Sequence, residues 1–161
     1  MRSSSLLAAL VWLMVLAGAS PDASAQATFM DGLAAYDSGD YRTAFEEWRN
    51  LAETGDAEAQ TALAGLYLDG LGTAVDAAAA LRWYRRAAEQ GEPVAQQSLG
   101  DLYGQGRGVA RDLVSAYVWL SLAAEQGWRW SARRRDEISR QLSPDQRTEA
   151  EARLQAWANA R

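Results

Sequence analysis

The chain has 161 residues, a length typical of one domain, and a formal net charge of −5, which argues against a general nucleic-acid-binding protein. Its commonest residue is alanine, all 16 basic residues are arginine, and the sequence contains no lysine, histidine or cysteine. This composition excludes disulfides, thiol catalysis, zinc sites built from cysteine and histidine, Schiff-base lysines and histidine general bases.

The first 25 residues have the features of a secretory signal peptide. Arg2 precedes an apolar run over residues 6–17, and the small residues 23–25 follow. Twelve apolar residues are too few to span a bilayer as a helix, which needs about 20. We expect cleavage after Ala25, with Ala27 as the nearby alternative, and a mature chain that is periplasmic or secreted and keeps no stable membrane anchor. An uncleaved membrane anchor is the alternative interpretation.

Residues 28–54 are predicted to form an opening helical hairpin. Its first helix is expected over residues 28–37, with Thr28 as the N-cap and with Phe29, Leu33 and Tyr36 on one face. Its second helix is expected up to residue 54, in a segment that matches the second half of the repeat described next.

Residues 55–90 and 91–126 are two copies of one 36-residue unit. Sixteen of the 36 aligned positions are identical without a gap, where composition alone would give roughly three. Each copy carries a helical stripe, a Gly-x-Gly pair, an aspartate suited to an N-cap, and a second helical stripe that ends in Ala-Ala-Glu-Gln-Gly. The unit is therefore predicted to be helix, glycine turn, helix, glycine turn. Small alanines at fixed stripe positions allow such helices to approach closely, and stacked units form a solenoid.

These residues resemble the Sel-one-like repeat (SLR) family, a relative of the tetratricopeptide solenoids. The family pattern A-x-A-Q-x-x-L-G-x-x-Y-x-x-G-x-G-V-x-x-D-x-x-x-A-x-x-W-x-x-x-A-A-E-Q-G begins at Ala57 and again at Pro93. The second copy departs from it at Pro93, and the first has Ala64 for the usual glycine and Thr73 for the usual valine. The resemblance covers residues 40–127. It implies an all-α, right-handed helical-hairpin solenoid.

Residues 127–161 are predicted to be C-terminal capping helices. After Gly127 the repeat fails, because Ser131 replaces the repeated alanine and Arg135 the repeated leucine, although residues 128–141 remain helical in composition. Residues 143–146, Ser-Pro-Asp-Gln, form a capping-box sequence with proline at the first helical position. A closing helix is expected from about 144 to 159, with Ala150, Leu154 and Trp157 on one face.

The SLR resemblance implies that the first helix of each hairpin lines the concave surface and contacts partners. In the helix over 57–69, a rotation of about 100° per residue points Thr61, Gly65 and Leu68 away from the apolar stripe. Their copies in the second unit differ in identity. The expected partner-binding residues are Thr61, Asp69, Gln97, Asp101 and Gln105.

The segment from Trp128 to Arg135 has two interpretations. Tryptophan and arginine dominate interface hot spots, so Trp128, Trp130, Arg133 and Arg134 form a candidate binding patch. Alternatively, the tryptophans cover the open end of the last repeat while the arginines face water.

The sequence predicts no catalytic residues, no cofactor and no metal. The run Gly104-x-Gly106-x-Gly108 lacks the preceding strand of a phosphate-binding loop. Ser98 lacks both a histidine to activate it and the first glycine of a nucleophile elbow. Paired carboxylates such as Glu46 and Glu47 point apart on a helix.

We therefore expect an exported, non-enzymatic scaffold that binds a protein or peptide and no nucleic acid. The alternative is a protein that binds cell-envelope glycan (peptidoglycan) or assists its processing through exposed tryptophans and carboxylates. Capture of a defined protein and retention on purified cell wall distinguish the two.

Overall fold

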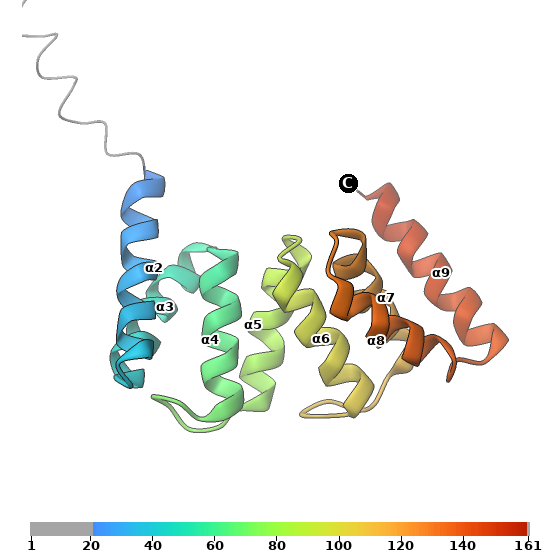
Figure 1. Cartoon of the computed structure of the whole chain (residues 1–161), viewed down its shortest axis with the longest axis horizontal. Helices are drawn as coiled ribbons and strands as arrows, with labels where there is room; N and C mark the ends of the chain where they lie inside the picture. Colours follow the sequence, from blue (N-terminus) through green and yellow to red (C-terminus); the bar gives the residue numbers. More distant parts are fainter. Residues whose placement is uncertain (1–20, 161) are drawn as a thin grey trace, which may run out of the picture.

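The protein is an all-α solenoid in the computed structural model, which describes residues 21–160. Figure 1 shows helices arranged along the long axis of the molecule, with α2 and α9 at opposite ends. This arrangement confirms the predicted fold class. The helices are α2 (Pro21–Asp37), α3 (Tyr41–Thr54), α4 (Ala57–Asp69), α5 (Ala77–Glu89), α6 (Pro93–Gln105), α7 (Leu113–Glu125), α8 (Arg129–Ser139) and α9 (Pro144–Asn159).

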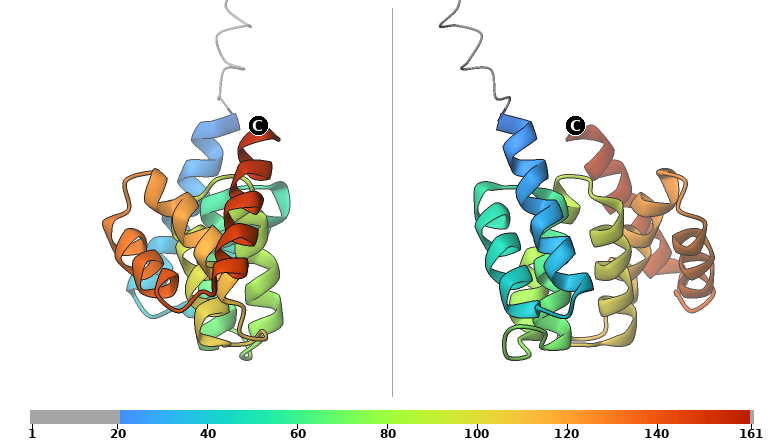
Figure 2. Two further views of the ribbon diagram at one scale, coloured as in Figure 1. Left: turned by 90° about the vertical axis from the view of Figure 1, so that its right-hand side faces the viewer. Right: turned by 60° about the vertical axis from the view of Figure 1, so that its left-hand side comes forward.

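The two ends of the described chain project from the same edge of the solenoid. Both views in Figure 2 show the start of α2 and the end of α9 on that edge. The apolar run of the predicted signal peptide, residues 6–17, lies outside the described residues, and the predicted cleavage position lies within α2. Within residues 21–160, no helix combines the length and apolarity that a membrane crossing requires.

Each second helix of a hairpin begins at an aspartate that caps it. Asp40, Asp76 and Asp112 accept hydrogen bonds from the backbone N–H three residues later, at 3.2, 2.8 and 3.0 Å. An N-cap of this kind stabilises a helix by about 1 kcal/mol, because it satisfies a backbone donor that has no partner within the helix. The 36-residue spacing of these aspartates therefore sets where α3, α5 and α7 start.

The Gly-x-Gly turns need glycine for both conformation and space. Gly72 and Gly108 have φ angles of +70° and +71°, in the left-handed region that side chains disfavour. A Cβ on Gly72 would lie 2.1 Å from the carbonyl oxygen of Tyr41, and one on Gly108 would lie 2.4 Å from Cβ of Ala77. Each turn thus packs directly against the start of the preceding second helix, which explains the second glycine of the motif.

Two buried glutamines, Gln60 and Gln96, connect successive hairpins. The side-chain amide of each donates to a carbonyl near the end of the preceding second helix and accepts from the glutamine that follows the next second helix. This ladder explains both glutamines of the repeat, since a buried amide needs partners for its donor and its acceptor. Its bonds run from Gln60 to Ala52 O (3.1 Å), Gln96 to Ala88 O (3.2 Å), Gln90 to Gln60 (2.8 Å) and Gln126 to Gln96 (2.9 Å).

Helices α2 and α3 form a first hairpin with a short turn. α2 begins at Pro21, so Thr28 lies inside the helix instead of capping it. A Cβ on Gly32 would lie 2.5 Å from the indole nitrogen of Trp48, just as one on Gly100 would lie 2.5 Å from Cγ of Leu120. The close approach of α2 to α3 therefore repeats that of α6 to α7, although the connecting turn is shorter.

The C-terminal helices close the other end. α8 follows the repeat register: its buried Ser131 lies at the position of Ala59 and Ala95, and its buried Ile138 lies at the position of Leu66 and Leu102. α9 starts with the predicted capping box, in which Ser143 and Gln146 bond each other's backbone N–H groups. Its buried Ala150 and its Trp157, 5.4 Å from Trp119 between ring centroids, cover the apolar side of α7.

Candidate binding surface on the first helices

The exposed sides of α4, α6 and α8 form one surface, which we call the first-helix face. Equivalent residues lie 36 positions apart, and three repeat positions are shared by all three helices, with different side chains on each. The face consists of Thr61, Ala62, Gly65 and Asp69 on α4, Val94, Gln97, Ser98 and Asp101 on α6, and Trp130, Arg133, Arg134 and Glu137 on α8.

A hollow of about 260 Å³ opens on the α4 part of this face. It forms because Gly65 contributes no side chain there, and a Cβ on Gly65 would meet only the hydroxyl of Tyr84, at 3.6 Å. Tyr36 and Val94 are exposed at its edge, so an apolar group has contact area both inside the hollow and around it. The lining residues are Tyr36, Trp48, Thr61, Ala62, Gly65, Leu66, Asp69, Leu71, Tyr84 and Val94.

Thr61 and Asp69, two of the predicted contact residues, lie in this hollow and also touch the next hairpin. The hydroxyl of Thr61 is 3.1 Å from Oε2 of Glu92 and 2.8 Å from the carbonyl oxygen of Ala57. Asp69 pairs with Arg107 at 3.5 Å, and both side chains are more than half exposed. These contacts leave the apolar walls of the hollow uncovered.

Acidic residues cap the two first helices next to the hollow. Glu92 caps α6, and Asp56 caps α4 by accepting from the backbone N–H of Ala59 at 2.7 Å. Burial raises the pKa of the Glu58 carboxyl, and the nearby charges of Asp56 and Glu92 raise it further. Burial also raises the pKa of the Tyr84 phenol, which therefore stays a neutral hydrogen-bonding group at pH 7.

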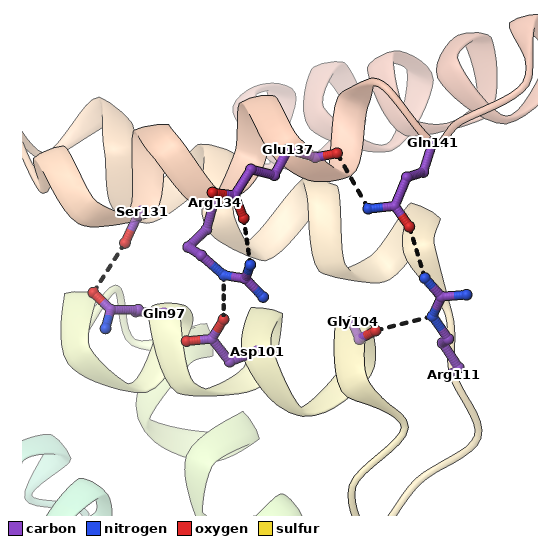
Figure 3. A network of polar contacts seen from close by, with 8 residues as sticks. All are labelled: Gln97, Asp101, Gly104, Arg111, Ser131, Arg134, Glu137 and Gln141. Atoms are coloured by element: carbon purple, nitrogen blue, oxygen red, sulfur yellow. Dashed lines mark hydrogen bonds and ion pairs between the residues drawn. The ribbon is translucent and has the colours of Figure 1, made fainter.

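On α6, the residues equivalent to Thr61 and Gly65 are Gln97 and Asp101, and both form hydrogen bonds to side chains of α8 (Figure 3). Gln97 accepts a hydrogen bond from the hydroxyl of Ser131 at 3.1 Å, and Asp101 accepts one from Nε of Arg134 at 3.1 Å. Arg134 also pairs with Glu137. Gln97 and Asp101, predicted as partner contacts, thus join two first helices within the chain.

Arg111 makes the contacts at the other end of this network, at the right of Figure 3. Its guanidinium donates to the carbonyl oxygen of Gly104 at 3.0 Å and to the side chain of Gln141 at 2.7 Å. Gln105, the fifth predicted contact residue, is exposed next to this region. Two direct bonds thus join α6 to α8, and Arg111 links the end of α6 to the residues that follow α8.

The tryptophans at the start of α8 do not cover the end of the solenoid. Trp128 and Trp130 are 37% and 56% exposed. The apolar side of α7, at the end of the last repeat, is covered by α9 and not by these tryptophans. Arg133 is exposed beside Trp130, whereas Arg134 turns toward α6. The structure thus separates the four residues of the predicted patch into an exposed set and one residue that stabilises the helix array.

The sequence did not predict Tyr36, Glu92 or Val94 as contact residues, and it placed Tyr36 only on the apolar face of the first helix. Val94 and Trp130 occupy the second position of the repeat motif in successive units, and this shared register was a usable signal. Tyr36 carried no such signal, because the shorter α2–α3 turn places it outside the 36-residue register.

The Sel1 repeat model matches the chain twice, over residues 57–92 and 93–128. The chain belongs to the Sel1-like repeat (SLR) family. Its two matched units start at α4 and α6, so each one pairs a first helix with the second helix that follows. No curated protein sequence matches this SLR chain significantly.

Solved structures show the same fold at 31–32% sequence identity. The chain is similar to c5321, a protective antigen of uropathogenic Escherichia coli strains with an SLR fold, at 31% identity and a TM-score of 0.79. It is also similar to a Sel1 repeat protein from Oxalobacter formigenes, at 32% identity and a TM-score of 0.60. These alignments cover 84% and 65% of this SLR chain, but only 30% and 41% of those proteins.

Proposed function

We propose that the chain is an exported, non-enzymatic scaffold that binds a protein or peptide along its first-helix face. The observation that carries this proposal is the open hollow beside Gly65, which exposes aromatic and aliphatic side chains next to polar groups. Sites for ligand groups are typically concave and mostly apolar, with a few polar groups that orient the ligand. The SLR fold agrees with a role in protein interaction.

The size of the hollow favours a side chain of a larger partner over a free small molecule. Sites for drug-sized ligands measure about 300–1,000 Å³ and enclose most of the ligand, whereas this hollow of about 260 Å³ is open on one side. A peptide would add contacts along the neighbouring helices, and each such contact need contribute only a little.

A hollow-filling substitution tests this proposal. Gly65→Leu places an apolar side chain in the space that the ligand would occupy, and its Cβ would meet only the hydroxyl of Tyr84, at an ordinary contact distance of 3.6 Å. Ala78→Leu is the matched control, since Ala78 is exposed on the second helix α5. We expect peptides selected from a random display library to bind the wild type and Ala78→Leu, and to lose at least tenfold in affinity for Gly65→Leu.

Two outcomes contradict this function. One is peptide binding that Gly65→Leu leaves unchanged. The other is an absence of selected peptides together with retention of the chain on purified peptidoglycan, which favours the glycan alternative.

Export has its own test. When the full chain is expressed in a bacterial host, mass spectrometry of the protein from the periplasmic fraction should give Gln26 as the first residue. Full-length protein that stays in the cytoplasm would contradict export.

A further inference from the structure

The first-helix face changes its charge from one end to the other. Residues 128–140 contain five arginines and two acidic residues, a net charge of +3 in a chain of −5, so the other residues carry −8. At the α4 end, two acidic residues lie at the hollow: Asp69 lines it, and Oε2 of Glu92 is 3.1 Å from the hydroxyl of Thr61. A ligand that lies along this face therefore meets opposite charge at its two ends.

The α8 end of the face, residues 128–140, contains both paired arginines and arginines without a hydrogen bond or ion pair among the described residues. Arg134 pairs with Asp101 and Glu137, and Arg135 pairs with Asp136. Within the part of the chain that the structure describes, the exposed side chains of Arg129 and Arg133 form no hydrogen bond or ion pair.

Arg129 and Arg133 lie one and three positions from Trp130 on α8, and the exposed side chain of Trp130 gives this end of the face an apolar surface near the charge. An arginine beside an exposed tryptophan suits a carboxylate on a chain that also carries apolar atoms, because arginine supplies directed donors and the ring supplies contact area.

The hollow on α4 and the basic residues near Trp130 on α8 lie along one continuous stretch of the first-helix face. Val94 lines the hollow, and Trp130 occupies the equivalent position on the next first helix. The hydrogen bond from Ser131 to Gln97 holds the start of α8 against α6. Neighbouring first helices meet through side chains, as the bonds from Ser131 to Gln97 and from Arg134 to Asp101 show, so their axes are on the order of 10 Å apart. Two such steps place α4 and α8 on the order of 20 Å apart across the face. An extended peptide rises about 3.3 Å per residue and covers that distance in five to six residues.

We propose that the partner presents an extended peptide segment with an apolar residue and an acidic residue five to six positions apart. The apolar side chain enters the hollow beside Gly65, and the carboxylate lies against Arg133 and Arg129 next to Trp130. This inference rests on the proposed function and names the chemistry of the partner. A flat anionic membrane fits less well, because the −8 charge of the remaining residues would repel it.

Synthetic peptides on the mature chain test this inference. The probes are fluorescent twelve-residue peptides with one leucine and one aspartate, separated by two to nine positions on an otherwise glycine–serine background. Fluorescence polarisation is measured against the wild type, Arg133→Gln and Arg82→Gln. Arg82 is the matched control because it is also an exposed arginine without an ion pair among the described residues, but it lies on the second helix α5.

The expected result is tightest binding at a separation of five or six. Replacing the aspartate by asparagine should weaken binding to the wild type by up to about fivefold, the upper end of the range for an exposed charge pair, and this difference should shrink at high salt. Arg133→Gln should remove the preference for aspartate, and Arg82→Gln should keep it.

The inference is overturned if aspartate and asparagine peptides bind the wild type equally, or if anionic phospholipid vesicles bind the chain and displace the peptide. If peptides bind and Gly65→Leu abolishes that binding while the acid preference is absent, the proposed function stands and this inference alone fails. Peptide binding that Gly65→Leu does not affect counts against the function itself.

Discussion

Replacing Gly108 with alanine is expected to destabilise the solenoid more than the same substitution at Gly127. Both glycines have left-handed φ angles, +71° and +91°, so alanine costs about 1–2 kcal/mol of conformational strain at either position. No atom lies within 4 Å of a Cβ on Gly127, whereas a Cβ on Gly108 would lie 2.4 Å from Cβ of Ala77. Relief of this overlap requires the turn to move away from α5.

The steric part of this difference has an expected size. Overpacking of a close contact typically costs 1–3 kcal/mol, so we expect Gly108→Ala to lose about 2–5 kcal/mol in total and Gly127→Ala about 1–2 kcal/mol. At roughly 2–6 °C per kcal/mol for a domain of this length, the melting temperatures of the two variants should differ by several degrees.

The assay is urea and thermal unfolding of the mature chain, followed by circular dichroism at 222 nm. The two variants should keep native helicity before the transition. Equal losses of stability in both would refute the reasoning, because the contact between the turn and Ala77 would then contribute nothing beyond the strain in φ.

Three further predictions follow from the repeat contacts. Gln96→Ala should lower the free energy of unfolding by about 2–3 kcal/mol, because it removes a buried side chain together with both of its hydrogen bonds. Gln126→Ala should cost less, about 1–2 kcal/mol, because it leaves only the buried side-chain oxygen of Gln96 without its donor. Urea midpoints measure both losses. Asp112→Ala should cost about 1 kcal/mol at pH 7 through loss of the N-cap, as measured by the same transitions. Arg134→Met should lower the melting temperature by removing the link from α8 to Asp101, whereas Arg133→Met should leave it unchanged in a thermal scan.

The Asp112 cap also predicts a dependence on pH. Partial burial opposes ionisation, but hydrogen bonds from Ser115 prevail and hold the pKa of Asp112 below its usual value. The folded pKa is the lower one, so the stabilisation is complete above about pH 4, the unfolded value, and is lost as pH falls through the folded pKa. Asp112→Asn keeps a capping side chain that does not titrate, and its melting temperature should fall less than that of the wild type between pH 5 and 3.

The 36-residue register made much of the solenoid predictable. The helix expected over 57–69 and the closing helix expected over 144–159 match α4 and α9. Their ends carry local signals, a glycine after the first and a capping box before the second, that act within a few residues. The predicted start of the first helix, at Thr28, was wrong. Threonine is a suitable N-cap residue, but the helix already begins at Pro21 and runs through the alanine-rich segment before Thr28.

Contacts between hairpins could not be predicted from the same pattern. The bond from Arg134 to Asp101 depends on the distance between α6 and α8, which no single helix determines. The hollow depends on the absence of a side chain at Gly65 and on the position of Tyr36, which belongs to the first hairpin, outside the repeat register. The exposure of Trp130 follows from the path of α9, whose start does not continue the 36-residue spacing.

Site-specific photocrosslinking tests the central claim most directly. Benzoylphenylalanine is placed at Ala62, which lines the hollow on α4, or at Ala78, which is exposed on α5. Each protein is irradiated with a peptide selected on the wild-type chain, and the adducts are counted by mass spectrometry. Binding along the first-helix face predicts crosslinks from Ala62 and none above background from Ala78; crosslinks from Ala78 alone would contradict it.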